Sequence, residues 1–281
     1  MNRIDPILVA WDGSREARAA ASYARALSAS LGTLTLLVHV TDPRDELVDV
    51  TRGRTERRRA AVERELDREI AQFTSPVERV MVSGQAAQRL LAEAKDRNAG
   101  LVVMGTRGRG RMGRAILGSV AEEVLRRIDR PVLVAHRETP SVRRVIVGVD
   151  GSNHDHAVVA AARAVAHAAK ADLLLAHVLL TDPSLAARPE SFGLARDVWE
   201  EAMKSISARV FDPLRVEVGE LAETKLLYGV PDEDLRKLAR ESRAEIVAVG
   251  RRGKAGRGIE HLFSTAMSLA MRGPHATLVV T

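Results

Sequence analysis

Short apolar runs alternate with stretches of helical period along this chain. In its first half the runs predict strands near residues 5–11, 34–40, 77–82, 100–104 and 131–135. The stretches between them predict helices over residues 15–31, 56–73, 86–98 and 118–129. Continuous apolar residues are typical of strands that helices cover on both faces. The pattern therefore predicts an α/β fold with a doubly wound, five-stranded parallel sheet.

The second half of the chain repeats the first. Residues 7–14 recur as residues 145–152, an offset of 138, and residues 37–40 recur at the same offset. From Gly84, which matches Gly229, the offset is 145, so the second copy carries seven more residues between its second and third strands. A period this long corresponds to two whole domains and not to a solenoid. We assign the first domain to residues 1–138 and the second to residues 143–281.

A glycine-rich loop follows the fourth strand of each copy. The first copy reads Gly105-Thr106-Arg107-Gly108, then nine residues, then Gly118-Ser119-Val120. The second copy reads Gly250-Arg251-Arg252-Gly253, then nine residues, then Phe263-Ser264-Thr265. Glycine between a strand and a helix lets backbone N–H groups approach a phosphate. The first loop is therefore predicted to hold a phosphorylated ligand, whereas the second has a phenyl ring at the position of Gly118.

Three segments of the first domain are predicted to converge on one site. Asp12, Val40 and Gly105 each lie at the carboxyl end of a predicted strand. Ligands of doubly wound sheets bind beyond these ends, at the point where the strand order reverses. Asp12-Gly13-Ser14, and its repeat at 150–152, also fits a plain turn that caps the following helix.

Composition narrows the function classes. The 281 residues include no cysteine, which excludes thiol catalysis, disulfides and thiolate metal sites. No apolar run approaches the length of a membrane span, and the first residues lack a leader pattern, so we expect a soluble, cytoplasmic protein without a membrane partner. Aromatic residues make up 3% of the chain, which argues against stacking on single-stranded nucleic acid.

The net charge of +6 is concentrated in the first half. Residues 1–140 contain 24 Lys and Arg against 19 Asp and Glu, a balance of +5. Two arginine clusters stand out, one at a predicted helix start and one in the first glycine loop: Arg52, Arg54, Arg57, Arg58 and Arg59; and Arg107, Arg109, Arg111 and Arg114. The helical cluster is typical of a solvated face, with a polyanion contact as the alternative. For the loop cluster we predict that at least one arginine closes over a bound triphosphate, against a solvated basic loop as the alternative.

Other catalytic signatures are absent or misplaced. The chain has neither the Gly-x4-Gly-Lys-Ser/Thr of P-loop proteins nor the Gly-x-Ser-x-Gly of hydrolases. Gly108, Gly110 and Gly113 match the dinucleotide fingerprint in form, but they follow the fourth strand instead of the first. His39 and His177 lie within apolar strands and are expected to be core or strand-end residues. His154, His156 and His167 show no carboxylate or second ligand at metal-binding spacing.

Taken together, these motifs resemble the universal stress protein family, present here as two tandem domains. The resemblance rests on residues 7–14, the Leu-Leu-Val-His-Val strand, Gly84, the loop at 103–110, the Gly118-Ser119-Val120 step and the closing Pro-Val-Leu-Val. It implies the strand order 3-2-1-4-5 and pairing of the domains through their fifth strands as an intramolecular pseudo-dimer. The apolar fifth strands at 132–134 and 278–280 support such pairing independently, because exposed sheet edges invite it.

The resemblance also implies a set of nucleotide-binding positions. In the first domain these are Ala10, Asp12, Val40, Met104, Gly105, Gly108, Arg109, Gly118, Ser119 and Val120. The matching positions of the second domain are Gly148, Asp150, Val178, Val249, Gly250, Gly253, Ser264 and Thr265. Because Phe263 breaks the second motif, we expect the first domain to bind nucleotide more tightly.

The expected ligand is an adenine nucleotide, ATP with Mg, and the expected role is a nucleotide-responsive regulator of stress response or dormancy. Two alternatives stay open: a weak ATP-hydrolysing or ATP-dependent transferring enzyme, and a cyclic-nucleotide-binding protein. Catalysis needs a positioned base and commonly several carboxylates, and this site offers Asp12 alone, so we expect no robust enzyme. A homodimer of the whole chain is compatible with the resemblance, whereas a nucleic-acid partner is not indicated.

Overall fold

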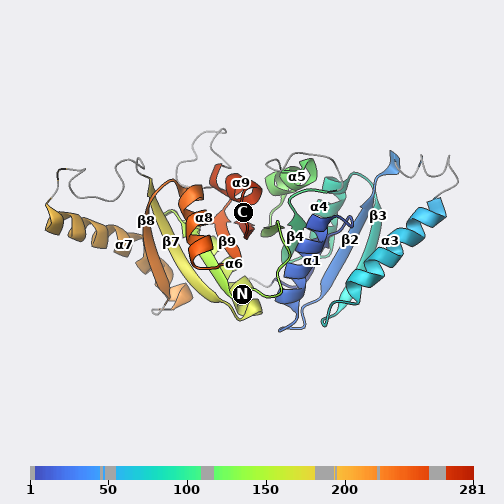
Figure 1. The fold of residues 1–281 in the computed structure, drawn as a ribbon, viewed down its shortest axis with the longest axis horizontal. Helices are drawn as coiled ribbons and strands as arrows, with labels where there is room; N and C mark the ends of the chain where they lie inside the picture. Colours follow the sequence, from blue (N-terminus) through green and yellow to red (C-terminus); the bar gives the residue numbers. More distant parts are fainter. Residues whose placement is uncertain are drawn as a thin grey trace.

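Strands and helices alternate through both halves of the chain (Figure 1). The computed structural model describes residues 4–44, 47, 55–108, 117–180, 193, 195–219, 222–252 and 264–281. The elements of the first domain are β1 (Ile7–Ala10), α1 (Arg15–Ser28), β2 (Thr35–Thr41), α3 (Thr55–Ile70), β3 (Val77–Ser83), α4 (Ala86–Asp96), β4 (Leu101–Gly105), α5 (Ser119–Arg127) and β5 (Val132–Ala135). Those of the second are β6 (Arg144–Val149), α6 (Asp155–Ala169), β7 (Asp172–Leu180), α7 (Arg196–Val218), β8 (Glu223–Gly229), α8 (Pro231–Glu241), β9 (Ile246–Gly250), α9 (Ser264–Met271) and β10 (Ala276–Val280).

All ten of these strands form one sheet, in the order β3-β2-β1-β4-β5-β10-β9-β6-β7-β8. Each half is parallel and runs 3-2-1-4-5 from its own outer edge to the centre. The halves meet where β5 pairs antiparallel with β10, Leu133 opposite Leu278. The predicted doubly wound fold and the pairing through the fifth strands are therefore confirmed.

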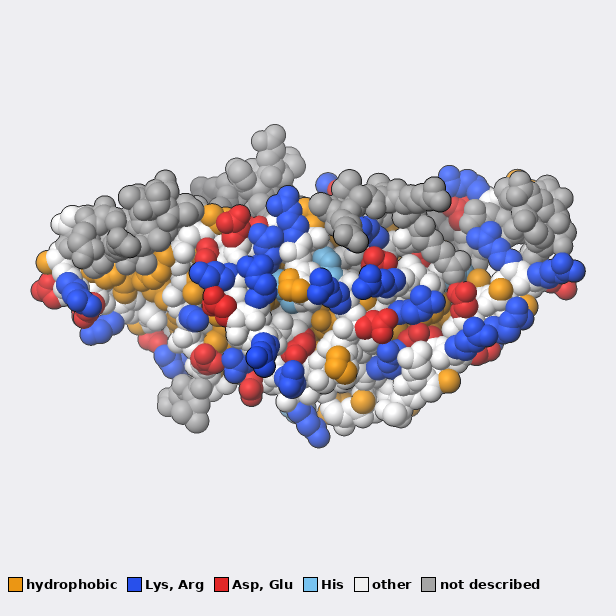
Figure 2. All heavy atoms as spheres, viewed as in Figure 1, with side chains coloured by type: hydrophobic (Ala, Val, Ile, Leu, Met, Phe, Trp, Pro, Cys, Tyr) orange, Lys and Arg blue, Asp and Glu red, His pale blue; other side chains and the backbone are white. Residues whose placement is uncertain are grey.

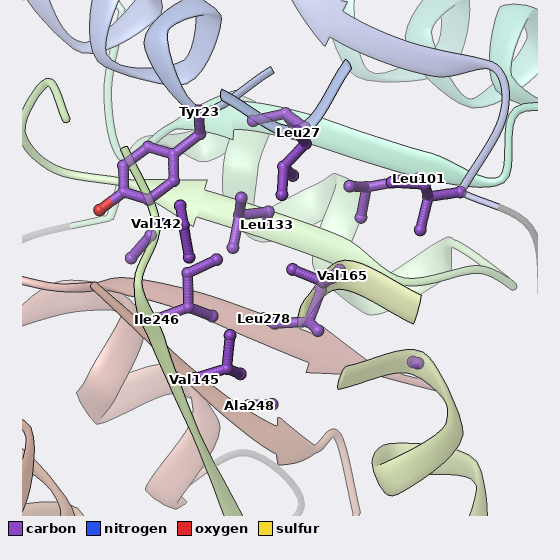
Figure 3. Packing of buried hydrophobic residues seen from close by; sticks show 14 of the residues in the cluster. Tyr23, Leu27, Leu101, Leu133, Val142, Val145, Val165, Ile246, Ala248 and Leu278 are labelled. Carbon is purple, nitrogen blue, oxygen red and sulfur yellow. The ribbon is translucent and has the colours of Figure 1, made fainter. Parts of the chain in front are cut away.

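The two domains share a continuous apolar core. One layer is covered by α1 and α3 of the first domain and by α6 and α7 of the second, and the opposite layer by α4, α5, α8 and α9. At the centre, Leu133 and Leu278 are fully buried between side chains of both domains (Figure 3). Tyr23 on α1 donates its hydroxyl to the backbone carbonyl of Glu245, 3.0 Å away in the other domain. Closing two apolar sheet edges against each other removes them from water, which makes the junction part of the fold.

The outer surface mixes charges of both signs. Lys and Arg side chains are spread over the visible face, with Asp and Glu among them (Figure 2). On α3, Arg57, Arg58 and Arg59 are exposed, and Arg59 pairs with Glu63 at 3.2 Å. This pairing favours the solvated-face interpretation of the helical arginine cluster; Arg52 and Arg54 lie outside the described residues. No helix in the described part of the chain is long and apolar enough to cross a membrane.

Candidate nucleotide site

A cavity of about 330 Å³ opens beyond the carboxyl ends of β1, β2 and β4. One side is apolar and is formed by Val40, Leu90 and Met104 from three different elements. The other side is formed by the glycine loop and by the first turn of α5. The strand order reverses at β1 and β4, so the cavity lies where a doubly wound sheet binds its ligands.

Asp12 is held at the cavity by the turn that follows β1. Its Oδ1 accepts a hydrogen bond from the backbone N–H of Ser14 at 2.9 Å. Ser14 in turn accepts from the N–H of Ala17 at 3.1 Å and caps α1. The turn requires a left-handed residue, which Gly13 supplies with φ of 75°. The turn-and-cap interpretation is therefore correct for Ser14, and the same turn fixes the Asp12 carboxylate at the cavity wall.

Gly108 lies directly beside the second oxygen of that carboxylate. A Cβ built on Gly108 would lie 2.5 Å from Asp12 Oδ2, so a side chain there would displace the carboxylate. Gly105 is more firmly constrained, since its Cβ would lie 2.6 Å from the Cβ and 2.7 Å from the backbone carbonyl carbon of Glu16 on α1. Gly105 lets the end of β4 approach α1, and Gly108 lets the following loop lie against the Asp12 carboxylate.

The N-terminus of α5 forms the polar end of the cavity. Gly118 is its N-cap, with φ of −67° and ψ of 147°, and its N–H donates to the carbonyl of Thr106 at 2.8 Å. Among the described residues no side chain caps this helix, and Ser119, Val120 and Ala121 of its first turn line the cavity. An uncapped helix start presents N–H donors and the positive end of the helix dipole to an anion.

Arg107 adds a cation to the same end. Its side chain lines the cavity and is about one-fifth exposed, with Nη2 3.9 Å from Glu16 Oε1. Of the four loop arginines it is the one that the structure places, because Arg109, Arg111 and Arg114 lie outside the described residues. The predicted closure of an arginine over a triphosphate stays a prediction.

Nine of the ten positions assigned to the first site line this one cavity, and Arg109 is the exception already noted. Residues that the sequence reasoning did not assign also line it: Trp11, Ala17, Val38, Ala86, Leu90 and Ala121. Ala86 and Leu90 lie in the first half of α4, directly after Gly84. The predicted start of this helix beside Gly84 could have indicated that its first turns line the site. No group of three His, Cys, Asp or Glu side chains suited to a metal occurs in the described residues.

The wall beside the first strand differs in the second domain. Gly148 replaces Ala10, and a Cβ built on it would lie 2.8 Å from Cδ1 of Leu235 and 3.1 Å from Cγ1 of Val249. Leu235 is the counterpart of Leu90, and the two side chains are equally buried, with 3% and 4% of their surface exposed. The missing methyl group at Gly148 therefore lets Leu235 pack down onto β6.

The turn after β6 is also closed on itself. The carboxylate of Asp155, at the position of Ala17, accepts from the backbone N–H groups of Asp150 and Gly151 at 3.2 and 2.7 Å. Burial, with the charge of Asp150 nearby, raises the pKa of Asp155 to about 6. The side chain of Asp150 accepts from the N–H of Ser152 at 3.0 Å. Asp155 thus holds the turn after β6 by hydrogen bonds. The equivalent turn of the first domain, after β1, borders the cavity.

The remaining positions of the second set are only partly placed. Val178, Val249 and Gly250 lie on β7 and β9, Ser264 and Thr265 begin α9, and Gly253 and Phe263 lie outside the described residues. A Cβ on Gly250 would lie 2.8 Å from the ring carbon Cδ2 of His154, which stands where Glu16 stands in the first domain.

The two strand histidines link neighbouring strand ends. His39 Nδ1 lies 3.0 Å from the carbonyl of Trp11, and His177 Nδ1 lies 2.7 Å from the carbonyl of Val149. These contacts give the pair a structural role at equivalent places of the two domains, in line with the strand-end interpretation.

The family model of the universal stress protein family matches residues 3–136 and again residues 141–281. The chain belongs to the universal stress protein family. It is 33% identical to a universal stress protein of Thermus aquaticus over 131 residues, which are 46% of this chain and 96% of that protein. It is 30% identical to a universal stress protein of Mycobacterium tuberculosis over 182 residues, 63% of this chain and 59% of the relative, so the match spans less than two thirds of the mycobacterial protein.

A solved structure also matches over nearly the whole length. The crystal structure of a universal stress protein from Archaeoglobus fulgidus has a TM-score of 0.68 and 18% identity, and the match covers 99% of this chain and 98% of that one. At this identity the likeness concerns the fold, and it extends to both domains together.

Proposed function

We propose that the first domain of this universal stress protein binds ATP and that the protein acts as a nucleotide-responsive regulator of stress response or dormancy. The observation that carries the proposal is the cavity itself. It joins an apolar slot to an uncapped helix start across about 330 Å³, within the range of small-molecule sites. An adenine nucleotide has the same division between an apolar base and an anionic tail.

The proposed pose follows from the lining. The base packs between Val40 and Leu90, and the ribose lies near Asp12, whose carboxylate can accept a hydroxyl hydrogen bond. The phosphates lie at the first turn of α5, within reach of the Ser119 hydroxyl and the backbone N–H groups. Arg107 contributes positive charge at this end.

Magnesium fits this site as part of the nucleotide complex. Mg²⁺ is commonly held by one or two carboxylates together with substrate phosphates and water. Asp12 is the carboxylate that lines the cavity among the described residues. We therefore propose Mg·ATP as the ligand, with the phosphates supplying most of the metal's oxygen ligands.

A regulatory role fits the lining better than a catalytic one. The described lining offers Asp12 but no histidine, lysine or second carboxylate that could act as a general base. We propose that ATP persists at the site and that its presence or absence is the signal. Steady turnover of ATP by the purified protein, lost on substitution of Asp12, would favour the enzymatic alternative.

The direct test is to identify the ligand that the protein carries. Mass spectrometry of small molecules released from freshly purified protein should detect ATP. Calorimetry with ATP, adenosine and cyclic AMP should then rank ATP first, because only its extended phosphate chain satisfies both the helix start and Arg107. Tighter binding of cyclic AMP than of ATP would contradict the proposal and support the cyclic-nucleotide alternative.

A further inference from the structure

The second domain reaches the nucleotide site of the first through one arginine. Arg251 follows β9 directly, at the start of the second glycine loop. Its Nη1 donates to the carbonyl of Ile128 at 2.8 Å and lies 3.3 Å from the carbonyls of Leu125 and Arg126. These three carbonyls belong to the last turn and C-cap of α5, in the other domain. A guanidinium at this place satisfies carbonyls that have no partner within the helix and opposes the negative end of its dipole.

The other end of the same helix lines the proposed phosphate site. α5 has nine residues, so at 1.5 Å per residue it is about 14 Å long. Ser119, Val120 and Ala121 line the cavity at its N-terminus, while Arg251 holds its C-terminus. A rod this short transmits any tilt or shift at one end to the other. Fixing its C-terminus therefore fixes the direction in which its N–H groups point.

Within the residues that the structure describes, the first domain does not place an arginine at the equivalent helix end of the second domain. The residue equivalent to Arg251 is Thr106, and both have the same backbone setting: Thr106 N–H donates to Ala135 at 3.2 Å and Arg251 N–H donates to Val280 at 2.6 Å. The short side chain of Thr106 is buried, with 3% exposed. In the described structure, the last turn of α9 instead meets the ring of His136 near the carbonyls of Leu269 and Ala270, and burial lowers the pKa of His136 to about 4. A cationic side chain thus caps the C-terminus of α5 from the second domain, whereas no arginine of the first domain caps α9 in the described structure.

We propose that Arg251 is a positioning residue through which the second domain orients α5 for phosphate binding in the first. The inference rests on the proposed function and assigns the second domain a part in that same site. Orientation of α5 before binding lowers the cost of ordering its N–H groups around the phosphates. Nucleotide binding and the Arg251 contact are coupled reciprocally, because both act on one helix. The second domain therefore tunes the affinity of its neighbour through this contact.

The test compares Arg251→Ala with Arg252→Ala, a matched control. Arg252 is the next residue of the same loop and is exposed. Calorimetry with ATP and with adenosine should give an ATP affinity about fivefold lower in Arg251→Ala, the size expected for a charge at a helix end. Adenosine should bind within about twofold of the unaltered protein, since it does not reach the start of α5. Arg252→Ala should match the unaltered protein for both ligands.

Two further variants separate positioning from folding. Arg251→Lys keeps the charge and should retain part of the ATP affinity, whereas Arg251→Gln keeps donors without charge and should retain less. Equal losses for ATP and adenosine, or no loss of ATP affinity in any Arg251 variant, would overturn the inference while leaving the proposed function intact. Absence of ATP binding by the unaltered protein would overturn both.

Discussion

The two domains repeat one fold but differ in what occupies the space beyond their first strand. In the first domain Ala10, Asp12 and the start of α5 surround an open cavity. In the second, Leu235 packs against Gly148 at the equivalent place, and Asp155 ties the neighbouring turn. A difference of one methyl group on a strand thus accompanies a different position of the leucine beside it. The comparison teaches that a repeated motif can keep its strand order while the residues beside the first strand change.

The largest expected effect comes from copying the second loop into the first. Gly118→Phe places the residue of position 263 at the N-cap of α5. The backbone at Gly118 accepts a side chain, but its Cβ would lie 3.3 Å from the Thr106 carbonyl oxygen and from Arg107 Cα, so the ring displaces the loop or the phosphates. We expect ATP affinity to fall by about 1–3 kcal/mol through lost charge-assisted hydrogen bonds.

Calorimetry with ATP measures this loss, and Gly118→Ala serves as the control for the small side chain. Alanine should cost less than phenylalanine, because it adds only the Cβ. Unchanged ATP affinity in Gly118→Phe would mean that the phosphates bind elsewhere.

Asp12 and its counterpart in the second domain, Asp150, give a second contrast with a smaller expected effect. Asp12→Asn keeps an oxygen for the Ser14 turn and removes the charge that faces the cavity. Mg·ATP affinity should fall about tenfold, or about 1.4 kcal/mol, because a charged acceptor is lost. Asp150→Asn in the second domain should leave the affinity unchanged. Similar losses in both variants would remove the functional distinction between the domains.

A third contrast concerns how the folding stability depends on pH. The buried carboxyl group of Asp155 in the second domain should make the stability fall as the pH rises. Asp155 has a pKa of about 6 in the folded protein, against an ordinary value of 3.8. Between these values the folded state holds a proton that the unfolded state releases, so this contribution to stability is present at low pH and is lost as the pH rises through 6.

Asparagine cannot ionise at this position. The stability of Asp155→Asn minus that of the unaltered protein should therefore increase by about 1 kcal/mol when the pH is raised from 5 to 8. Urea unfolding at the two pH values measures it. A stability difference between variant and parent that is the same at both would show that Asp155 ionises alike in the folded and unfolded chains. ATP affinity should not change with this substitution.

The smallest expected effect concerns the arginine that lines the cavity. Arg107→Ala should weaken ATP relative to adenosine by about 0.5–1 kcal/mol, and less at high salt, because the site is partly exposed. Its counterpart Arg252→Ala should have no effect on either ligand. If the ratio of ATP to adenosine affinity stays constant in Arg107→Ala at low salt, Arg107 is solvated charge and the clamp is wrong for this residue.

The fold was largely predictable because apolar runs and sheet topology are local or repetitive signals. In the first domain the predicted strand limits agree with β1 to β5 within two residues. The predicted helices run two to three residues too far at their ends, as in 15–31 against Arg15–Ser28. Apolar periodicity continues into the turns after the last helical hydrogen bond, so it cannot mark the end of a helix.

Site residues could be predicted where the residue type alone indicates the function. They could not be predicted where the effect depends on a contact between residues that are far apart in the sequence. Gly108 and Gly118 are readable as glycines in a loop. Gly148 looked equivalent to Ala10, since its consequence depends on Leu235, 87 residues away. The contact of Arg251 with Ile128 spans 123 residues and two domains, so no local pattern reports it.

The most direct test of the asymmetry between the domains is the number of ATP molecules bound per chain. Calorimetry of the unaltered protein, freed of any bound nucleotide and titrated with Mg·ATP, should show one tight site. The same titration of Gly118→Phe should show that site weakened by the amount given above, whereas Asp150→Asn should leave its affinity unchanged. Two equal tight sites in the unaltered protein would contradict the account, because Phe263, Leu235 and Asp155 would then not weaken binding in the second domain.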